Sequence, residues 1–206
     1  MEEKSDFEKD LASIRQIMER SVKFVSLSGV SGILAGIYAS AAAFYIYRYV
    51  FLGAMARPHE YFELQPARVY QLVTVGIVTL AASLITGWYF SYRKANRLGL
   101  SIWDATSKRL LLSLSIPLAA GGIFSLLLLW HGYFLLVAPV CLLFYGLALV
   151  NASQNLFVEI RYLGYCEIVL GLISTVFIGY GLLFWAIGFG VLHIVYGVVM
   201  YRKYDA

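Results

Sequence analysis

The sequence RYLGYCEIVLGLISTVF, residues 161–177, is followed after the tetrapeptide IGYG by LLFWAIGFGVLHIVYGVVMYRKY, residues 182–204. The glycines of the tetrapeptide let the chain reverse sharply, so the two apolar runs predict an antiparallel helical hairpin. Glu167 and His193 lie deep within this apolar sequence, each thirteen residues from the centre of the turn. At a rise of about 1.5 Å per residue, both side chains are expected at the same depth.

These two ionisable side chains are expected to form a hydrogen bond with each other. Placing such a group inside a membrane costs about 2.5 kcal/mol or more, so it usually faces the bundle interior and finds a partner there. Burial and mutual proximity act in opposite directions on the charge state of the pair, and the sequence leaves that state open. The chain also reverses direction at the short connection near Val158. Asn151 precedes this connection by about as many residues as Glu167 follows it, so Asn151 is expected at a similar depth. A buried polar cluster of Glu167, His193 and Asn151 is therefore predicted.

The composition indicates a membrane protein. Hydrophobic residues make up 61% and charged residues 14% of the 206-residue chain, whereas soluble domains are about half apolar and about a quarter charged. The basic residues flank the apolar runs, which indicates membrane topology and not nucleic-acid binding. The two cysteines form no CxxC or Cys/His spacing, and HEYFE at residues 59–63 lacks the second histidine of HExxH. No disulfide framework, metal site or cofactor is predicted.

Six apolar runs predict an all-α fold, a polytopic membrane helical bundle of six transmembrane helices arranged as three hairpins. Residues 1–22 are acidic and amphipathic and predict an additional cytoplasmic, interfacial helix. Thirteen of the sixteen Lys and Arg residues fall on one side of this arrangement, which places both termini in the cytoplasm. The predicted transmembrane domain covers residues 23–206, with spans at 24–47, 69–90, 110–130, 133–150, 162–178 and 182–201.

Small residues recur at every fourth position of the first span: Ser28, Gly32, Gly36 and Ser40. They predict a close-packing face, because small side chains let the backbone of another helix approach. The partner is expected to be a neighbouring helix of the same chain or, alternatively, a second copy. The dipeptide Tyr-Gly also recurs, at residues 145–146 and 196–197, and indicates an internal repeat.

Two segments carry a family resemblance. IRQIMERSVKFVSLSGVSGILAG, residues 14–36, and GLLFWAIGFGVLHIVYG, residues 181–197, resemble segments of uncharacterised multi-pass proteins of bacterial inner membranes. The resemblance extends over most of the chain and implies an inner-membrane location without an activity. The three-hairpin layout is also loosely similar to that of small acid-resistance membrane proteins, and this similarity concerns architecture alone.

Three functional classes follow from these residues. The first is a non-catalytic membrane scaffold or sensor that acts through helix contacts with a second copy or a membrane partner protein. The alternative is a small-solute or proton-linked transporter or channel that uses Glu167 and His193. The third, a membrane enzyme, is disfavoured because one buried acid and one histidine make up no nucleophile, metal set or acid cluster. We therefore expect no catalytic residue, with the lipid bilayer as the main partner.

Overall fold

The structure is a computed structural model that describes residues 28–52, 66–97, 99, 105–153 and 157–205. The predicted helix at residues 1–22 lies outside these ranges. The described part is helical and contains no β-strand. Its elements are α2 (Gly29–Tyr45), the π-helical η1 (Ile46–Phe51), α5 (Pro66–Arg97), α6 (Ala105–Trp130), the short η2 (Phe134–Leu136), α7 (Val137–Ala152), α8 (Val158–Val176), α9 (Gly181–Trp185), the π-helical η4 (Ala186–Leu192), α10 (His193–Met200) and the π-helical η5 (Tyr201–Asp205).

Each predicted span overlaps a helix. Five helices of the described part are long and apolar enough to cross a membrane. The remaining one, α8, is 19 residues long and more polar, because it carries Glu159, Arg161 and Glu167. The helix ends differ from the predicted span ends; α5 continues to Arg97, well past the predicted end at residue 90. A helix extends beyond its apolar stretch because Lys, Arg and Ala are good helix formers and hydrophobicity is not required to continue the backbone hydrogen bonds.

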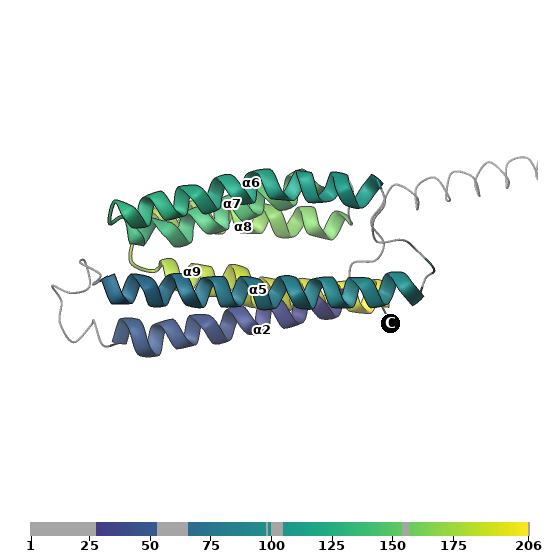
Figure 1. The fold of residues 1–206 in the computed structure, drawn as a ribbon, viewed down its shortest axis with the longest axis horizontal. Helices are drawn as coiled ribbons and strands as arrows, with labels where there is room; N and C mark the ends of the chain where they lie inside the picture. The colour runs from purple at the N-terminus through teal and green to yellow at the C-terminus, as the bar shows by residue number, and fades with distance from the viewer. Residues whose placement is uncertain (1–27, 53–65, 98, 100–104, 154–156, 206) are drawn as a thin grey trace, which may run out of the picture.

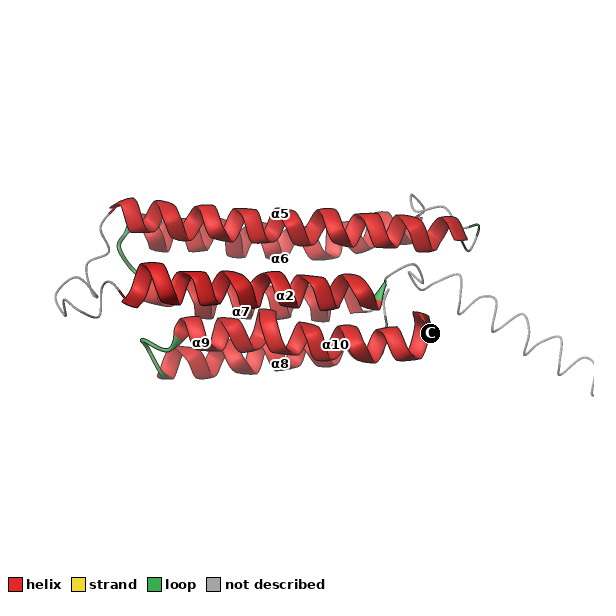
Figure 2. Ribbon diagram, turned by 90° about the horizontal axis from the view of Figure 1, so that it is seen from below, coloured by secondary structure: helices red, strands yellow, loops and turns green. Residues whose placement is uncertain are grey.

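The helices form two layers (Figure 1). One layer contains α5, α2 and the long helix that runs from α9 through η5; the other contains α6, α7 and α8. Within the layers, α2 contacts both α5 and α10, and α7 contacts both α6 and α8. The layers meet where α7 and α8 touch α9, η4 and α10. Helices α2 and α10, from opposite ends of the chain, thus lie side by side (Figure 2).

Glycines decide which helices approach most closely. A Cβ atom placed on Gly36 of α2 would lie 2.6 Å from the carbonyl oxygen of Gly190 and 2.6 Å from Cγ1 of Ile194. Likewise, a Cβ on Gly146 of α7 would lie 2.6 Å from the carbonyl oxygen of Gly164 in α8. Close backbone approach of this kind stabilises helix pairs through van der Waals contact. The tightest partners of α10 and α8 are therefore α2 and α7, and not each other.

The small-residue face of α2 packs inside the molecule. Gly32 lies against Gly197, so closely that a Cβ added to Gly32 would be 3.2 Å from the Gly197 Cα atom. Ser40 sits opposite Gly190, where an added Cβ would be 2.6 Å from the Ser40 hydroxyl oxygen. Of the two partners considered for this face, the described residues place a helix of the same chain there.

An apolar cluster fills the space between the layers near the chain's C-terminal end. Tyr145, Leu192, Tyr196 and Tyr204 pack against it with part of their surface. The cluster is built from aliphatic and aromatic side chains of four helices and of the segment before α8. Its buried members are Leu110, Leu149, Ala152, Phe157, Ile160, Leu163 and Met200.

Candidate functional site

Glu167 and His193 lie together between α8 and α10. The Glu167 side chain is 0% exposed and that of His193 is 9% exposed. His193 Nδ1 is 3.6 Å from Glu167 Oε1, which is close enough for electrostatic attraction but too long for a hydrogen bond. The two residues, equally far from the turn, are thus neighbours in the folded chain, but the expected hydrogen bond between them is absent.

His193 is held by two hydrogen bonds that do not involve Glu167. Its Nδ1 lies 2.9 Å from the carbonyl oxygen of Gly188, and because a carbonyl only accepts, Nδ1 is the donor. The Tyr145 hydroxyl lies 2.7 Å from Nε2. In the neutral imidazole, Nε2 accepts a hydrogen bond from the Tyr145 hydroxyl group. Both ring nitrogens are therefore occupied, and neither is available to the carboxyl group of Glu167.

The π-helical segment η4 explains why Gly188 can accept this bond. In a π-helix the backbone bonds run from residue i to i+5 in place of i+4, and single π turns within α-helices occur frequently at functional sites. Gly188 also makes room for the acid: a Cβ there would collide with the Glu167 carboxylate and with Leu142. The carboxyl group occupies the space that a side chain at this position would need.

The carboxyl group of Glu167 has no hydrogen-bond donor among the described residues. This holds for both of its oxygens, which are buried. A buried polar group without a partner costs about 1–3 kcal/mol, and more when it is charged. Two further buried hydroxyl oxygens in the described part share this condition, those of Ser174 in α8 and Tyr196 in α10. Ser174 is 0% exposed.

Aromatic rings fix the orientation of the imidazole. The Phe189 ring stacks on that of His193, with centroids 5.8 Å apart, and lies 4.9 Å from the Tyr145 ring. Trp185 also contacts the Phe189 ring, at 5.2 Å between centroids. Rings in contact at these distances restrict one another's rotation and keep the two hydrogen bonds of His193 aligned.

Asn151 does not join this cluster, and its predicted place there is wrong. Its side chain is exposed, and its amide donates a hydrogen bond to the carbonyl oxygen of Ser113 in α6, at 2.8 Å. Reflection about a turn gives a residue's depth but not its direction around the helix axis. Asn151 points from α7 towards α6, whereas Tyr145, on another face of α7, reaches His193.

Two polar contacts close the end of the bundle that the basic residues predict to be cytoplasmic. Asp205 accepts a hydrogen bond from the Gly29 backbone at 2.7 Å and from the Ser28 hydroxyl at 3.1 Å, which caps the start of α2. Lys94 of α5 binds its other oxygen at 2.5 Å. A carboxylate at a helix N-terminus is favourable because the first backbone N–H groups lack partners. The C-terminal residues thereby join α2, α5 and α10.

The second contact joins η5 to α8. Lys203 donates a hydrogen bond to Glu159 at 2.5 Å, and the Tyr204 hydroxyl donates to the same carboxylate at 3.2 Å. Glu159 lies before the predicted span at 162–178. Partial burial by itself raises the pKa of Glu159, but the hydrogen bonds and the charge of Lys203 outweigh it and lower the pKa below its ordinary value.

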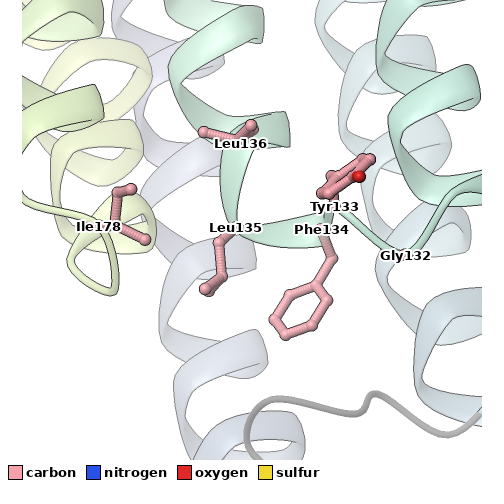
Figure 3. Close-up of a pocket in the computed structure, with 6 residues that line it drawn as sticks. All are labelled: Gly132, Tyr133, Phe134, Leu135, Leu136 and Ile178. Atoms are coloured by element: carbon pink, nitrogen blue, oxygen red, sulfur yellow. The ribbon is translucent and has the colours of Figure 1, made fainter.

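The described residues offer little to a metal ion or a polar ligand elsewhere. No group of three or more His, Cys, Asp or Glu side chains gathers among them to hold a metal ion, and HEYFE falls outside the described ranges. Cys141 and Cys166 are free thiols. An open apolar pocket of about 250 Å³ lies at the turn between α6 and α7 (Figure 3), lined by Gly132, Tyr133, Phe134, Leu135, Leu136 and Ile178. None of these residues belongs to the Glu167 cluster.

Three residues of the site do not follow from sequence reasoning. Tyr145 and Tyr196 stand out through the repeated Tyr-Gly dipeptide, but the dipeptide indicates a repeat and gives no partner for the hydroxyl groups. Gly188 is one of several glycines in its run, and nothing in the sequence marks a π-helical turn there.

Comparisons with protein-family models, with curated proteins and with solved structures find no match to this chain. The family resemblance stays an expectation.

Proposed function

We propose that the chain crosses a membrane six times, as three sequential hairpins with both termini in the cytoplasm. Large apolar side chains on the outer faces support this: Leu84 is 64%, Ile116 69% and Val176 76% exposed. Contiguous apolar surface of this kind is rare on soluble monomers, and acyl chains would cover it. The imbalance of basic residues supports the orientation. A bacterial inner membrane is the location that the family resemblance implies.

Within the membrane, we propose that the protein is a small-solute or proton-linked transporter or channel in which Glu167 takes up and releases a proton. One observation carries this proposal: the Glu167 carboxyl is fully buried and neither oxygen has a donor among the described residues. If Glu167 served only to tie α8 to α10, its oxygens would accept hydrogen bonds, as buried polar groups normally do. A carboxyl group held without a fixed donor is free to exchange its proton.

His193 acts in this proposal as the residue that shapes the site. Its two ring nitrogens are bonded to Tyr145 and Gly188, so it keeps its place whatever Glu167 does. Its ring lies near enough to favour the ionised carboxylate whenever the imidazole is charged. Intramembrane chains of Asp, Glu and His are common elements of proton-coupled pumps and transporters.

The test uses the purified full-length chain in proteoliposomes. Infrared difference spectra between two pH values should contain a carboxylic C=O band that disappears in Glu167→Gln. The same variant should abolish proton-dependent flux, whereas Glu159→Gln, which alters an acid outside the predicted span, should keep it. Circular dichroism and gel filtration must show that both variants are folded. A spectrum and a flux that Glu167→Gln leaves unchanged would remove Glu167 from any transport role.

A second candidate, a scaffold that assembles with itself or a membrane partner, is favoured by α5. No residue in the apolar window of α5 is buried, and the main contacts of this helix are with α2 and η1. A helix so exposed offers a face to a second protein as readily as to lipid. With Val78→Cys placed on this face, oxidative cross-linking in membranes should yield a discrete dimer or a heterologous adduct. A monomer under these conditions argues against assembly through α5.

A further inference from the structure

Three buried polar groups without partners among the described residues lie at successive depths of the bundle. Glu167 and Ser174 are seven residues apart on α8, which is about two helical turns, so they share one face and lie about 10 Å apart along the axis. Both are 0% exposed. Each carries oxygen atoms for which the described residues supply no hydrogen-bond partner.

The third group, Tyr196, lies on α10, about one turn beyond His193. It follows His193 by three residues, which places the two side chains on adjacent positions of one helix face. Its hydroxyl oxygen is buried and lacks a partner among the described residues. Helices α8 and α10 are antiparallel, joined through the turn before α9 (Figure 2). Ser174 therefore lies towards that turn and Tyr196 towards the opposite end, with Glu167 between them.

The spacing suits proton transfer. From Ser174 to Tyr196 the three groups span a depth of about 15 Å at 1.5 Å per residue, about half of a hydrocarbon core roughly 30 Å thick. Buried polar groups that lack protein partners are normally bonded to ordered water. A hydroxyl group accepts one hydrogen bond and donates another, so Ser174 and Tyr196 can each pass a proton between water molecules without becoming charged. A carboxylate can hold the proton between them.

We propose that the species this protein carries is the proton itself, and that Ser174, Glu167 and Tyr196 relay it between α8 and the helix that runs from α9 through η5. This inference rests on the proposed transport function and names its cargo. An excess proton enters as hydronium and is handed on by the Ser174 hydroxyl, which takes up one proton as it releases its own to the next water. The last water of this chain passes a proton to the Glu167 carboxylate, which becomes a neutral carboxylic acid, and every water and hydroxyl is left neutral. The acid then releases the proton through water to the Tyr196 hydroxyl, which passes on its own proton, and the site returns to its starting state.

His193 and Tyr145 are positioning residues and not carriers in this relay. His193 faces Glu167 from α10, and Tyr145 of α7 lies on the far side of the imidazole. The two side chains are hydrogen-bonded to each other, and Nδ1 of His193 donates a hydrogen bond to the carbonyl oxygen of Gly188. The apolar cluster against which Tyr196 packs lies beyond the end of the relay. Side-chain movement there would admit water and control when the proton leaves.

The experiment measures proton flux into proteoliposomes that contain the full-length chain and no added solute. A potassium gradient with valinomycin sets the membrane potential, and a trapped pH-sensitive dye reports the flux. Ser174→Ala and Tyr196→Phe should each slow the flux by about tenfold or more, since each removes one hydrogen-bonding link of the relay. Matched controls are Thr175→Ala and Tyr162→Phe, which remove a hydroxyl group from exposed side chains and should keep wild-type flux.

The outcomes separate the relay from the transport function. If Glu167→Gln abolishes flux but Ser174→Ala and Tyr196→Phe behave like the controls, the relay is wrong and the role of Glu167 stands. If the wild-type chain passes no protons without a solute, the proton is not the cargo by itself, whatever the infrared band of Glu167 shows. If all variants, Glu167→Gln included, conduct like the wild type, both proposals fail. A deuterium-oxide slowing of wild-type flux that is lost in Tyr196→Phe would support the relay.

Discussion

Gly36→Ala tests the close approach of α2 and α10 on which the fold depends. The new methyl carbon would lie 2.6 Å from the Gly190 carbonyl oxygen, 2.6 Å from Cγ1 of Ile194 and 2.8 Å from the Ile194 backbone nitrogen. An ordinary contact needs about 3.5 Å, so the two helices must separate locally by about 0.9 Å. Two of the three obstructing atoms belong to the backbone and cannot turn aside.

Overpacking of this kind costs about 1–3 kcal/mol, and a backbone obstruction places Gly36→Ala near the upper end of that range. Alanine also gains about 0.5–1 kcal/mol over glycine from helix propensity. Gly76→Ala in α5 isolates this second effect, because nothing lies within 4 Å of a Cβ at that position. The difference in stability between the two variants is therefore the cost of the collision.

The assay is reversible unfolding in mixed detergent micelles, followed by circular dichroism. Gly36→Ala should lower the free energy of unfolding by about 1–3 kcal/mol relative to Gly76→Ala, which changes the ratio of folded to unfolded protein by about fivefold or more. Equal stability of the two variants would refute the reasoning. It would mean that α2 and the C-terminal helix do not touch through their glycines.

Three further results are expected. Gly188→Ala should destabilise the wild-type chain but cost less in a Glu167→Ala background, because its methyl group collides with that carboxylate; equal costs in a double-mutant cycle would contradict the contact. Glu159→Gln should slightly lower the stability of the folded chain at neutral pH and have no effect in acid. The pKa of Glu159 is lowered on folding, so its ionised carboxylate stabilises the fold at pH values above the unfolded pKa. This stabilisation disappears as the pH falls through the pKa of the folded state. Thermal unfolding of the variant and the wild type at several pH values measures this difference in stability. A difference that does not change with pH would exclude a stabilising role of the ionised Glu159. Cys166 is exposed on α8, and under the proposed topology acyl chains cover this face. In membranes, a water-soluble maleimide should therefore label an Asn96→Cys variant at position 96 and leave Cys166 unmodified. Rapid labelling of Cys166 would place its thiol in water.

The helical class and the helices themselves could be predicted from the sequence. The apolar runs are long, contain few charges and are bounded by turn residues or basic clusters, and each becomes a helix. Membrane-length hydrophobic helices are specified locally, since every backbone hydrogen bond is made within the segment itself. The third predicted hairpin shows the limit: a short turn joins α8 to α9, yet α10 packs most closely on α2.

The candidate site was predictable in part. Glu167 and His193 could be placed at one depth because they are equally far from the turn. In the structure, His193 Nδ1 lies 3.6 Å from Glu167 Oε1. Tyr145 and Gly188 could not be assigned as partners of His193, because one comes from another helix and the other depends on a π-helical turn. Asn151 has a suitable depth, but it faces α6.

The sequence by itself determined the apolar character of this protein, its helices and the depth of each polar residue along them, because composition and chain distance follow directly from residue order. Tertiary structure alone decided which side of each helix faces which neighbour. The rotation of each helix about its axis is set by close contacts between glycines of neighbouring helices. Examples are Gly36 with Gly190, which are far apart in the chain, and Gly146 with Gly164. Because these contacts turn the acid of α8 towards Gly188 and His193, they leave its oxygens buried without a fixed donor, and the proposed function depends on that arrangement.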